Sequence, residues 1–444
     1  MRPRLRKLIA TLPLLLAQLA CASGGATTTI DTVSAGIADR AAVDPRSWPQ
    51  RARGSLPPDV ATADGLTLQE AVGIALWNNL AFQLTLTDLG VARAEVLDAG
   101  LLRNPILSIL FPWGPKQLEA TANWAVDSIW QRPRRLAAAN LDLEAVGSRL
   151  VQDGIVLIGT VRTAYVQTVV AERRAQLARE TADVIAKFTG IVEARFKSGE
   201  ISELDARASR DDRLIAEALA RTADHDRTVA MVRLKATIGV PQDPPLTLTP
   251  LQDLTVQTCG DPDSLIKDAL AARPDVRAAE LAIEAAAARA GLARAQAVAV
   301  TAILDANARG AEGFEMGPGV AVELPLYSLN SGARARAAAA LLQAQGRYLA
   351  VRARVDEEVR TAAAMLARAR DVLSLWEGEA LDSVAIEQRQ AQLAYEAGEL
   401  PLLAVLDAHR RRTTILMAGL DARRELLAAA AALDQAIGRS CTLK

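Results

Sequence analysis

The chain has 444 residues and a net charge of −1, and it is 50% hydrophobic but only 3% aromatic. This balance, without a basic patch interleaved with aromatic residues, argues against a nucleic-acid partner. The chain has two histidines and lacks a glycine-rich phosphate loop, a nucleophile elbow and the Cys and His spacing of a metal site. These absences argue against an enzyme and predict no bound metal.

The first twenty residues predict a signal peptide. Arg2, Arg4, Arg6 and Lys7 precede an apolar stretch that ends in small residues at Ala20 and is too short to span a membrane. Cys21 follows in a context that resembles a bacterial lipobox, although Gln18 stands where the pattern prefers leucine. The pattern predicts a covalent lipid on Cys21, with ordinary cleavage after Ala20 or Ala22 as the alternative. The protein is exported in either case.

Residues 21–63 are rich in Ser, Thr, Gly, Pro and Asp and predict an extended leader. The helical pattern then begins at Thr67, where Glu70 completes a capping box, and runs to about Leu102. Two stretches of alternating apolar and polar residues follow and predict strands at about 104–130. A second pair of such stretches lies at about 297–326. Each of the four strands is apolar on one face and largely polar on the other.

Very long helices follow each pair of strands. Residues 134–197 and 333–397 contain no proline, and a helix of that length would span roughly 95 Å at 1.5 Å per residue. Within the second stretch, apolar residues from Val355 to Trp376 repeat at alternating spacings of four and three, which predicts a coiled-coil seam. Each long helix ends at a glycine-containing turn and returns as a shorter helix, over 203–238 and 402–437.

The order of elements is therefore repeated, with Gly199 of the first turn corresponding to Gly398 of the second. We divide the chain into a signal peptide (1–20), a lipidated leader (21–63) and two repeats (64–250 and 263–438), separated by a linker (251–262) and followed by a tail (439–444). Beyond the signal peptide, we expect no helix apolar enough to cross a membrane.

Four strands cannot close a membrane barrel, because known barrels begin at eight strands. Only helices and closed barrels satisfy every backbone polar group in a bilayer. If these strands span a membrane, several copies of the chain must share one barrel. A small periplasmic sheet is the alternative that the strands leave open.

Two further cysteines, Cys259 in the linker and Cys441 near the C-terminus, would lie in an oxidising compartment after export. They are a candidate disulfide, and two unpaired thiols are the alternative.

The order and duplication of these motifs resemble the TolC-like outer-membrane efflux protein family, from about Leu66 to Gly438. The resemblance includes Arg273-Pro274-Asp275-Val276 at the start of the second repeat and Gly319 to Leu326 at the passage from strand to helix. Gly100 to Pro105 most resembles the lipoprotein and heavy-metal-efflux branches. The resemblance implies a mainly α fold with a small β part, in which three chains share a twelve-stranded barrel and a twelve-helix α-barrel.

The same resemblance implies an exit duct in the outer membrane of a Gram-negative bacterium, lipid-anchored, with a long periplasmic part. Its partners would be a periplasmic adaptor and an inner-membrane pump of the resistance-nodulation-division or a similar type. No cofactor is implied beyond the lipid. A periplasmic coiled-coil scaffold or adaptor without a channel is the alternative function. The cargo is not indicated by any motif.

Site residues also follow from the resemblance. The turns would form the periplasmic tip and dock the adaptor through Gly199, Glu200, Gly398 and Glu399. Asp205 and Tyr395 match positions of a hydrogen-bonding link between neighbouring hairpins, and Asp407 matches part of an acidic ring at the gate. Leu400 and Ala404 depart from the family pattern, so we expect a weaker gate with a single acidic ring formed by Asp407. We hypothesise that Asp407 favours the passage of cations or binds a blocking cation. The alternative is that Asp205 and Asp407 are solvated charges at helix N-termini, where the helix dipole favours carboxylates. His225 and His409 are expected to be solvated face residues.

Overall fold

The computed structural model describes residues 28–41, 65–113, 118–243, 245–250, 256–257, 259–308, 313–376 and 378–442. The signal peptide and Cys21 lie outside the described residues. The chain divides into two compact units. Unit 1 comprises residues 1–33, 85–150 and 274–353, and unit 2 comprises residues 34–84, 151–273 and 354–444.

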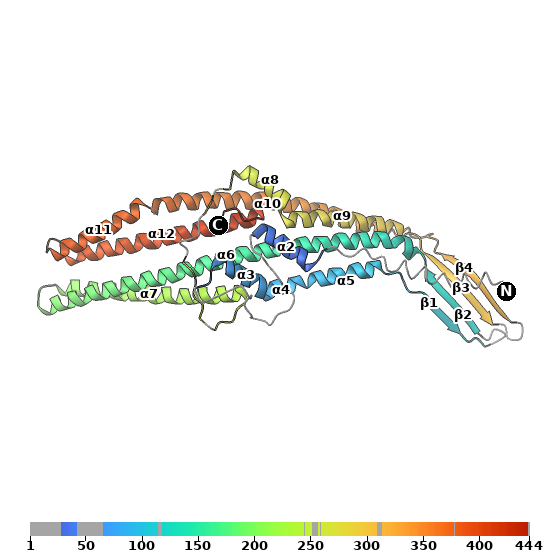
Figure 1. Ribbon diagram of the computed structural model, residues 1–444, viewed down its shortest axis with the longest axis horizontal. Coiled ribbons are helices and arrows are strands. Elements are labelled where there is room, and N and C mark those ends of the chain that lie inside the picture. The colour runs from blue at the N-terminus through green and yellow to red at the C-terminus, as the bar shows by residue number, and fades with distance from the viewer. Residues whose placement is uncertain are drawn as a thin grey trace. The chain divides into compact units, whose positions relative to one another are not determined.

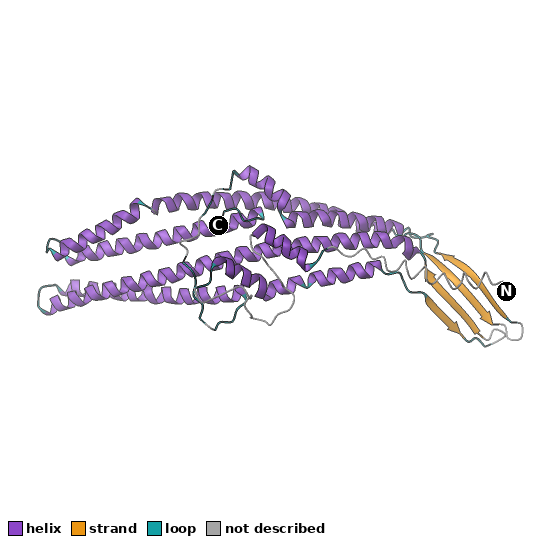
Figure 2. Ribbon diagram, viewed as in Figure 1, coloured by secondary structure: helices purple, strands orange, loops and turns teal. Residues whose placement is uncertain are grey.

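The described elements are mostly helices, with one small sheet (Figures 1 and 2), as the sequence predicts. The helices are α2 (Ile30–Ala41), α3 (Leu68–Asn78), α4 (Leu80–Leu86), α5 (Asp88–Gly100), α6 (Asp127–Lys197), α7 (Glu203–Ile238), α8 (Pro262–Ala272), α9 (Pro274–Ala295), α10 (Ser331–Trp376), α11 (Glu379–Glu396) and α12 (Leu402–Ile437). The strands are β1 (Ile106–Leu110), β2 (Leu118–Ala125), β3 (Val300–Ala308) and β4 (Phe314–Val322).

The four strands of unit 1 form one antiparallel sheet in the order β1-β2-β3-β4 (Figure 1). They lie within the predicted ranges, and the central pair joins the two repeats. The register places Thr121 opposite Asp305, and the Thr121 hydroxyl donates a hydrogen bond of 3.0 Å to that carboxylate. The amide of Asn307 donates a second one of 2.6 Å to Asp305. These polar residues share one face of the sheet.

The opposite face is apolar and carries exposed side chains among the described residues. One row across the sheet consists of Leu107, Ala122, Leu304 and Pro318. Large side chains on this face are exposed, including Leu107 at 65% and Val320 at 69%. A large exposed apolar face on a sheet is typical of a surface that contacts another apolar environment.

The core of unit 2 contains two helical hairpins, α6 with α7 and α10–α11 with α12. The predicted seam is confirmed, because Val355, Val359 and Ala362 are buried, as are the next three apolar residues at the same spacing, Leu366, Ala369 and Leu373. At the start of the first repeat, the buried Tyr165 hydroxyl donates to the carbonyls of Leu66 and Thr249 at 2.7 and 3.0 Å. These two hydrogen bonds connect both ends of the first repeat to α6.

The predictions for the N-terminal segments were wrong in part. The leader is not wholly extended, because α2 forms where Ile30, Val33 and Ile37 recur at helical spacing, and Val33 and Ile37 are buried. The capping box of Thr67 and Glu70 is confirmed, but the predicted helix from 67 to 102 is three helices. Asn79 interrupts the first, since its backbone is extended and its side chain accepts from the N–H of Phe82.

The two long helices also differ from the prediction. The first begins earlier, at Asp127, with Pro133 inside it, whereas the second is broken between Trp376 and Glu379. Gly378 adopts φ = 84° at the break, a conformation that a helix cannot continue through. The expectation of no membrane-length apolar helix was wrong by length and composition, because α6 contains one such window. Since 56% of that window is buried, it is also typical of a core helix.

Candidate functional site: the turns of the two helical hairpins

The turns at the ends of α6 and α11 have the same backbone geometry. Gly199 and Gly398 adopt φ values of 82° and 79°. In each turn the glycine N–H bonds to the carbonyl three residues back, and the following N–H bonds to the carbonyl five residues back, at 2.8 to 3.0 Å. This is the Schellman motif, which closes a helix with a left-handed residue. Both turns therefore need glycine.

The returning helices begin differently. In the first hairpin, the Ser202 hydroxyl accepts from the N–H of Asp205 at 3.2 Å and donates to its carboxylate at 2.7 Å. In the second, Pro401 occupies the cap position and provides no side-chain hydrogen bond. Asp205 is thus engaged in its own helix start, where the helix dipole also favours a carboxylate.

Tyr395 joins the two hairpins inside one chain. Its hydroxyl lies 3.5 Å from the guanidinium of Arg195, which donates to it. Its ring packs, with Phe196 and Ile201, against a small core formed by Val192 and Ala206. Among the described residues of one chain, Tyr395 bonds to Arg195 and not to Asp205. A link from Tyr395 to Asp205 of a neighbouring chain stays a prediction.

Asp407 is paired rather than free. Its carboxylate lies 3.5 Å from Arg410 one turn along α12, and Arg410 also forms an ion pair with Asp212 on α7. One arginine therefore stands between two carboxylates of different hairpins. The nearby guanidinium reduces the field of Asp407, but a single arginine shared by two carboxylates leaves this group with a net negative charge.

His409 is not the solvated residue expected from its charged neighbours. It is half-buried, its ring meets Phe188 of α6 edge-on with centroids 5.9 Å apart, and the amide of Gln388 on α11 lies 3.2 Å from a ring nitrogen. Burial, and then the nearby Arg412, lower the pKa of His409 below its ordinary value. His409 thus connects three helices. His225 is exposed, as expected.

The predicted docking residues are accessible. Glu200 and Glu399 are exposed in the two turns, and Glu200 accepts a hydrogen bond of 2.9 Å from Ser198. Leu400, where the family pattern has arginine, is 39% exposed. Farther along the hairpins from these turns, α6, α7 and α12 enclose a groove of about 1060 Å³ whose apolar lining includes Ile215, Leu219 and Met417. Among the described residues, no group of three or more His, Cys, Asp or Glu side chains could hold a metal ion.

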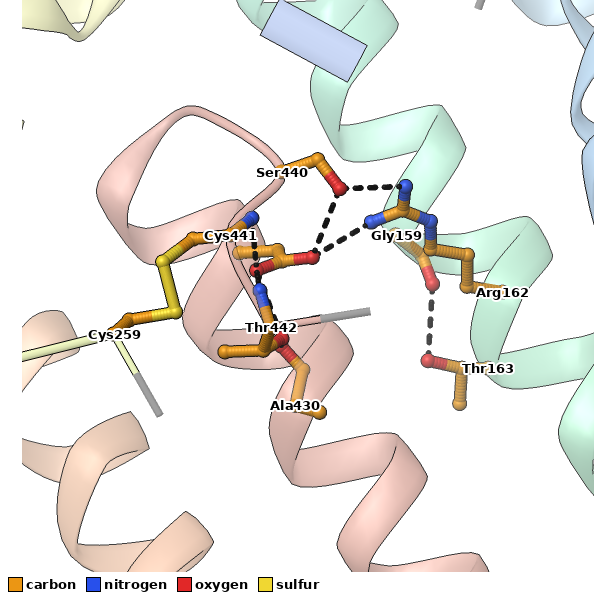
Figure 3. A network of polar contacts seen from close by, with 9 residues as sticks. Gly159, Arg162, Thr163, Cys259, Ala430, Ser440, Cys441 and Thr442 are labelled. Carbon is orange, nitrogen blue, oxygen red and sulfur yellow. Dashed lines mark hydrogen bonds and ion pairs between the residues drawn. A yellow bond between two sulfur atoms is a disulfide. The ribbon is translucent and has the colours of Figure 1, made fainter. Parts of the chain in front are cut away.

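The candidate disulfide is present. Cys259 and Cys441 are bonded, with their Cα atoms 6.0 Å apart and a separation of 182 residues in sequence (Figure 3). The adjoining backbone is also joined, because the N–H of Gln257 donates to the carbonyl of Thr442 at 2.9 Å. The linker is thereby attached to the C-terminal tail.

The tail surrounds a buried carboxylate. Asp434 of α12 accepts from the N–H groups of Cys441 and Thr442 at 2.9 and 2.7 Å and pairs with Arg162 of α6 at 3.0 Å (Figure 3). The Thr442 hydroxyl also bonds to Asp434 and to the carbonyl of Ala430. No sequence motif marks this cluster around Asp434, and an acid near the end of an apolar helix is its only signal in the sequence.

Comparison with known proteins agrees with this architecture. Residues 265–439 match the family model described as outer membrane efflux protein. The chain is 24% identical over 382 residues to the cobalt-zinc-cadmium resistance protein CzcC of Cupriavidus metallidurans, covering 85% of this chain and 91% of CzcC. It is 26% identical over 301 residues to the pyoverdine export outer membrane protein OpmQ of Pseudomonas putida, covering 62% and 59%.

Solved structures share the fold. CusC superposes with a TM-score of 0.69 at 20% identity, covering 88% of this chain and 99% of that chain. The open-state MtrE outer membrane channel of Neisseria gonorrhoeae gives a TM-score of 0.68 at 18% identity, covering 89% and 98%. The second repeat thus matches the outer membrane efflux protein family, and the solved structures share the fold over 88% and 89% of this chain.

Proposed function

We propose that the chain is the outer-membrane exit duct of a tripartite efflux system, assembled from three copies. The observation that carries the proposal is the four-stranded sheet, which pairs its strands in the order β1-β2-β3-β4 and exposes an apolar face. An open sheet cannot remain in a bilayer, because its edge strands carry unsatisfied backbone groups. Three copies supply twelve strands, an even number within the range of known barrels.

In this proposal the hairpins of three copies form the periplasmic part of the duct. The turns at Gly199 and Gly398 form the tip, which docks a periplasmic adaptor through Glu200 and Glu399. The adaptor connects the duct to an inner-membrane pump of the resistance-nodulation-division or a similar type. The two repeats differ at their turns, which supports a gate whose two hairpins have different roles.

We further propose that a lipid on Cys21 anchors the chain to the outer membrane, after removal of the signal peptide. The lipobox-like sequence supports this anchor, and the barrel would hold the protein in the membrane independently of it. Intact-mass measurement of the N-terminal peptide tests this proposal. A mass without acyl chains would contradict it.

The duct is proposed to be passive toward its cargo. CzcC is named for resistance to metal ions and OpmQ for export of pyoverdine. Similarity of one chain to relatives with cargoes this different supports selection of the cargo by the pump rather than by the duct. Co-purification of the pump and adaptor with this chain would identify that cargo class.

Fractionation of the outer membrane followed by gel migration with and without heating tests the assembly. We expect a band of three times the monomer mass that converts to monomer on boiling. The variant Ala122→Pro, which removes a backbone donor from the central strand β2, should abolish this band. The control variant Ala418→Ser, on α12 in unit 2, should retain it. A monomer in the soluble periplasmic fraction would instead indicate a scaffold without a channel.

A further inference from the structure

All four connections between the sheet and the helices of unit 1 leave from the same end of the strands. The register pairs Ala125 at the end of β2 with Thr301 near the start of β3, and Val300 with Val322 at the end of β4. Strand β1 begins at Ile106, opposite Asn123. We define the edge band as the residues next to these connections, 98–105, 126–135, 294–299 and 323–336.

The edge band is strongly basic. It contains seven arginines and three acidic residues, a net charge of +4 in a chain whose total is −1. The arginines are Arg103, Arg132, Arg134, Arg135, Arg294, Arg334 and Arg336, and the acidic residues are Asp98, Asp127 and Glu323.

Five of the seven arginines are exposed, and their guanidinium groups make no ion pair or hydrogen bond with another described residue: Arg103, Arg134, Arg294, Arg334 and Arg336. The other two donate to the carbonyls of Gly100 and Leu101 at the end of α5, at 2.6 and 2.9 Å. Of the acids, Asp127 is buried and accepts from Gln131 at 3.1 Å. The five exposed guanidinium groups are therefore available to a ligand. One of the three carboxylates, Asp127, is buried and does not face a ligand at the surface.

Exposed apolar side chains lie between these arginines and the sheet. Along the passage from β4 to α10, Leu324, Leu326 and Tyr327 are 69%, 77% and 101% exposed, and Arg334 and Arg336 follow. On α6, Trp130 is 44% exposed and precedes Arg134 by four residues, so the two lie on one helix face about 6 Å apart along the axis.

Polarity thus increases from apolar residues through an aromatic residue to arginine. Polarity increases in the same order from the hydrocarbon core of a membrane to its headgroups. Aromatic rings favour the interfacial region, and arginine stems lie along apolar surface while the guanidinium reaches the headgroups. Guanidinium groups bind phosphate through two parallel hydrogen bonds, and each basic residue near an anionic membrane surface strengthens binding.

We infer that the edge band is a binding surface for the phosphate headgroups of anionic phospholipids in the leaflet that faces the helices. The inference rests on the proposed function, since it needs the sheet to lie in a bilayer. It adds a lipid class to that function, because an apolar belt alone would not distinguish anionic from zwitterionic lipids.

The test uses full-length protein in phosphatidylcholine vesicles that contain brominated phosphatidylglycerol or brominated phosphatidylcholine. Bromine quenches nearby tryptophan, and the part of the quenching lost in Trp130→Phe reports lipids at the edge band. We expect phosphatidylglycerol to be preferred by about tenfold at low salt and less at high salt. In the combined variant Arg134→Gln, Arg334→Gln and Arg336→Gln, the preference should fall close to one.

Two controls separate charge from structure. Replacing the same three arginines by lysine should retain most of the preference. Replacing Arg173, Arg233 and Arg389 by glutamine removes the same charge from exposed positions of unit 2 and should leave the preference unchanged. Equal quenching by both lipids in the wild type, or an unchanged preference in the band variant, would overturn the inference.

Insertion is measured first, by co-flotation with pure phosphatidylcholine vesicles and by heat-sensitive trimer migration. Wild-type protein that inserts but shows no lipid preference contradicts the inference alone. Wild-type protein that neither floats nor migrates as a trimer contradicts the proposed function, and the inference with it.

Discussion

Arg162 on α6 and Asp434 on α12 form an ion pair of 3.0 Å whose side chains are only 11% and 3% exposed. The pair joins the first repeat to the second, and the tail residues Cys441 and Thr442 complete the coordination of the carboxylate. Burial lowers the pKa of Arg162, and Asp434 counteracts that effect. Removing either partner of such a buried ion pair leaves the other charge buried without compensation.

Removing one partner should therefore destabilise the protein strongly. We expect Asp434→Ala to lower the free energy of unfolding by about 3–5 kcal/mol, because Arg162 is left buried and uncompensated. The control Asp421→Ala breaks the more exposed pair with Arg174 and should cost at most about 1 kcal/mol. Denaturant unfolding followed by circular dichroism measures both, and equal losses would contradict this role of Asp434.

The disulfide should add stability that a reductant removes. We expect Cys259→Ser to cost about 2–5 kcal/mol, since the open chain regains the conformations that the long loop restricts. Cys441→Ser should cost the same, and the double variant no more than either single one. A thermal midpoint of the wild type that does not move with reductant would show that the bond does not contribute.

His409 should make stability depend on pH. Its folded pKa lies below the ordinary value of 6.5, so the unfolded chain binds more protons in the intervening range. The contribution is fully present above about pH 6.5 and is lost as the pH falls through the folded pKa. The midpoint difference between wild type and His409→Gln, measured from pH 8 to 5, should therefore shrink toward acid pH. A constant difference would contradict burial of the neutral ring.

A side chain at either turn glycine should destabilise the protein through backbone conformation alone. An added Cβ at Gly199 would meet nothing within 4 Å, but φ there is 82°. We expect Gly199→Ala to cost about 1 kcal/mol. The control Gly190→Ala also has open space but lies inside α6, and it should stabilise by about 1 kcal/mol. Changes of the same sign in both variants would contradict this account.

Asp407 and Arg410 should have opposite effects on ion selectivity. If Asp407 faces the lumen, Arg410→Gln releases its charge and should increase the preference for cations, whereas Asp407→Asn should decrease it. Reversal potentials across a potassium chloride gradient measure the preference. Identical potentials in both variants and in the wild type would contradict a role for Asp407 at the gate.

The sequence predicted the features that depend on local periodicity. The alternation of apolar and polar residues located the four strands. The spacing of apolar residues from Val355 onward located the seam of α10. Each pattern could be recognised because it repeats over several residues or helical turns. The capping box at Thr67 was equally local. The repeated glycine motif located the two turns, where Gly199 and Gly398 adopt positive φ values, and family resemblance supplied only their predicted docking role.

The sequence did not predict features that depend on contacts between distant segments. His409 lies among charged residues in sequence, yet Phe188 and Gln388 from two other helices cover its ring. Asp434 similarly acquires its partners from α6 and from the tail. The short helix α2 was missed because its apolar pattern is short. Its apolar residues are buried through contacts with other segments.

Single-channel recording of purified full-length trimer in a planar bilayer tests the exit-duct account most directly. The account predicts discrete conductance steps for the wild-type trimer, and none for Ala122→Pro protein, which should not assemble. Trimeric protein that inserts into the bilayer and yet conducts no ions would contradict it.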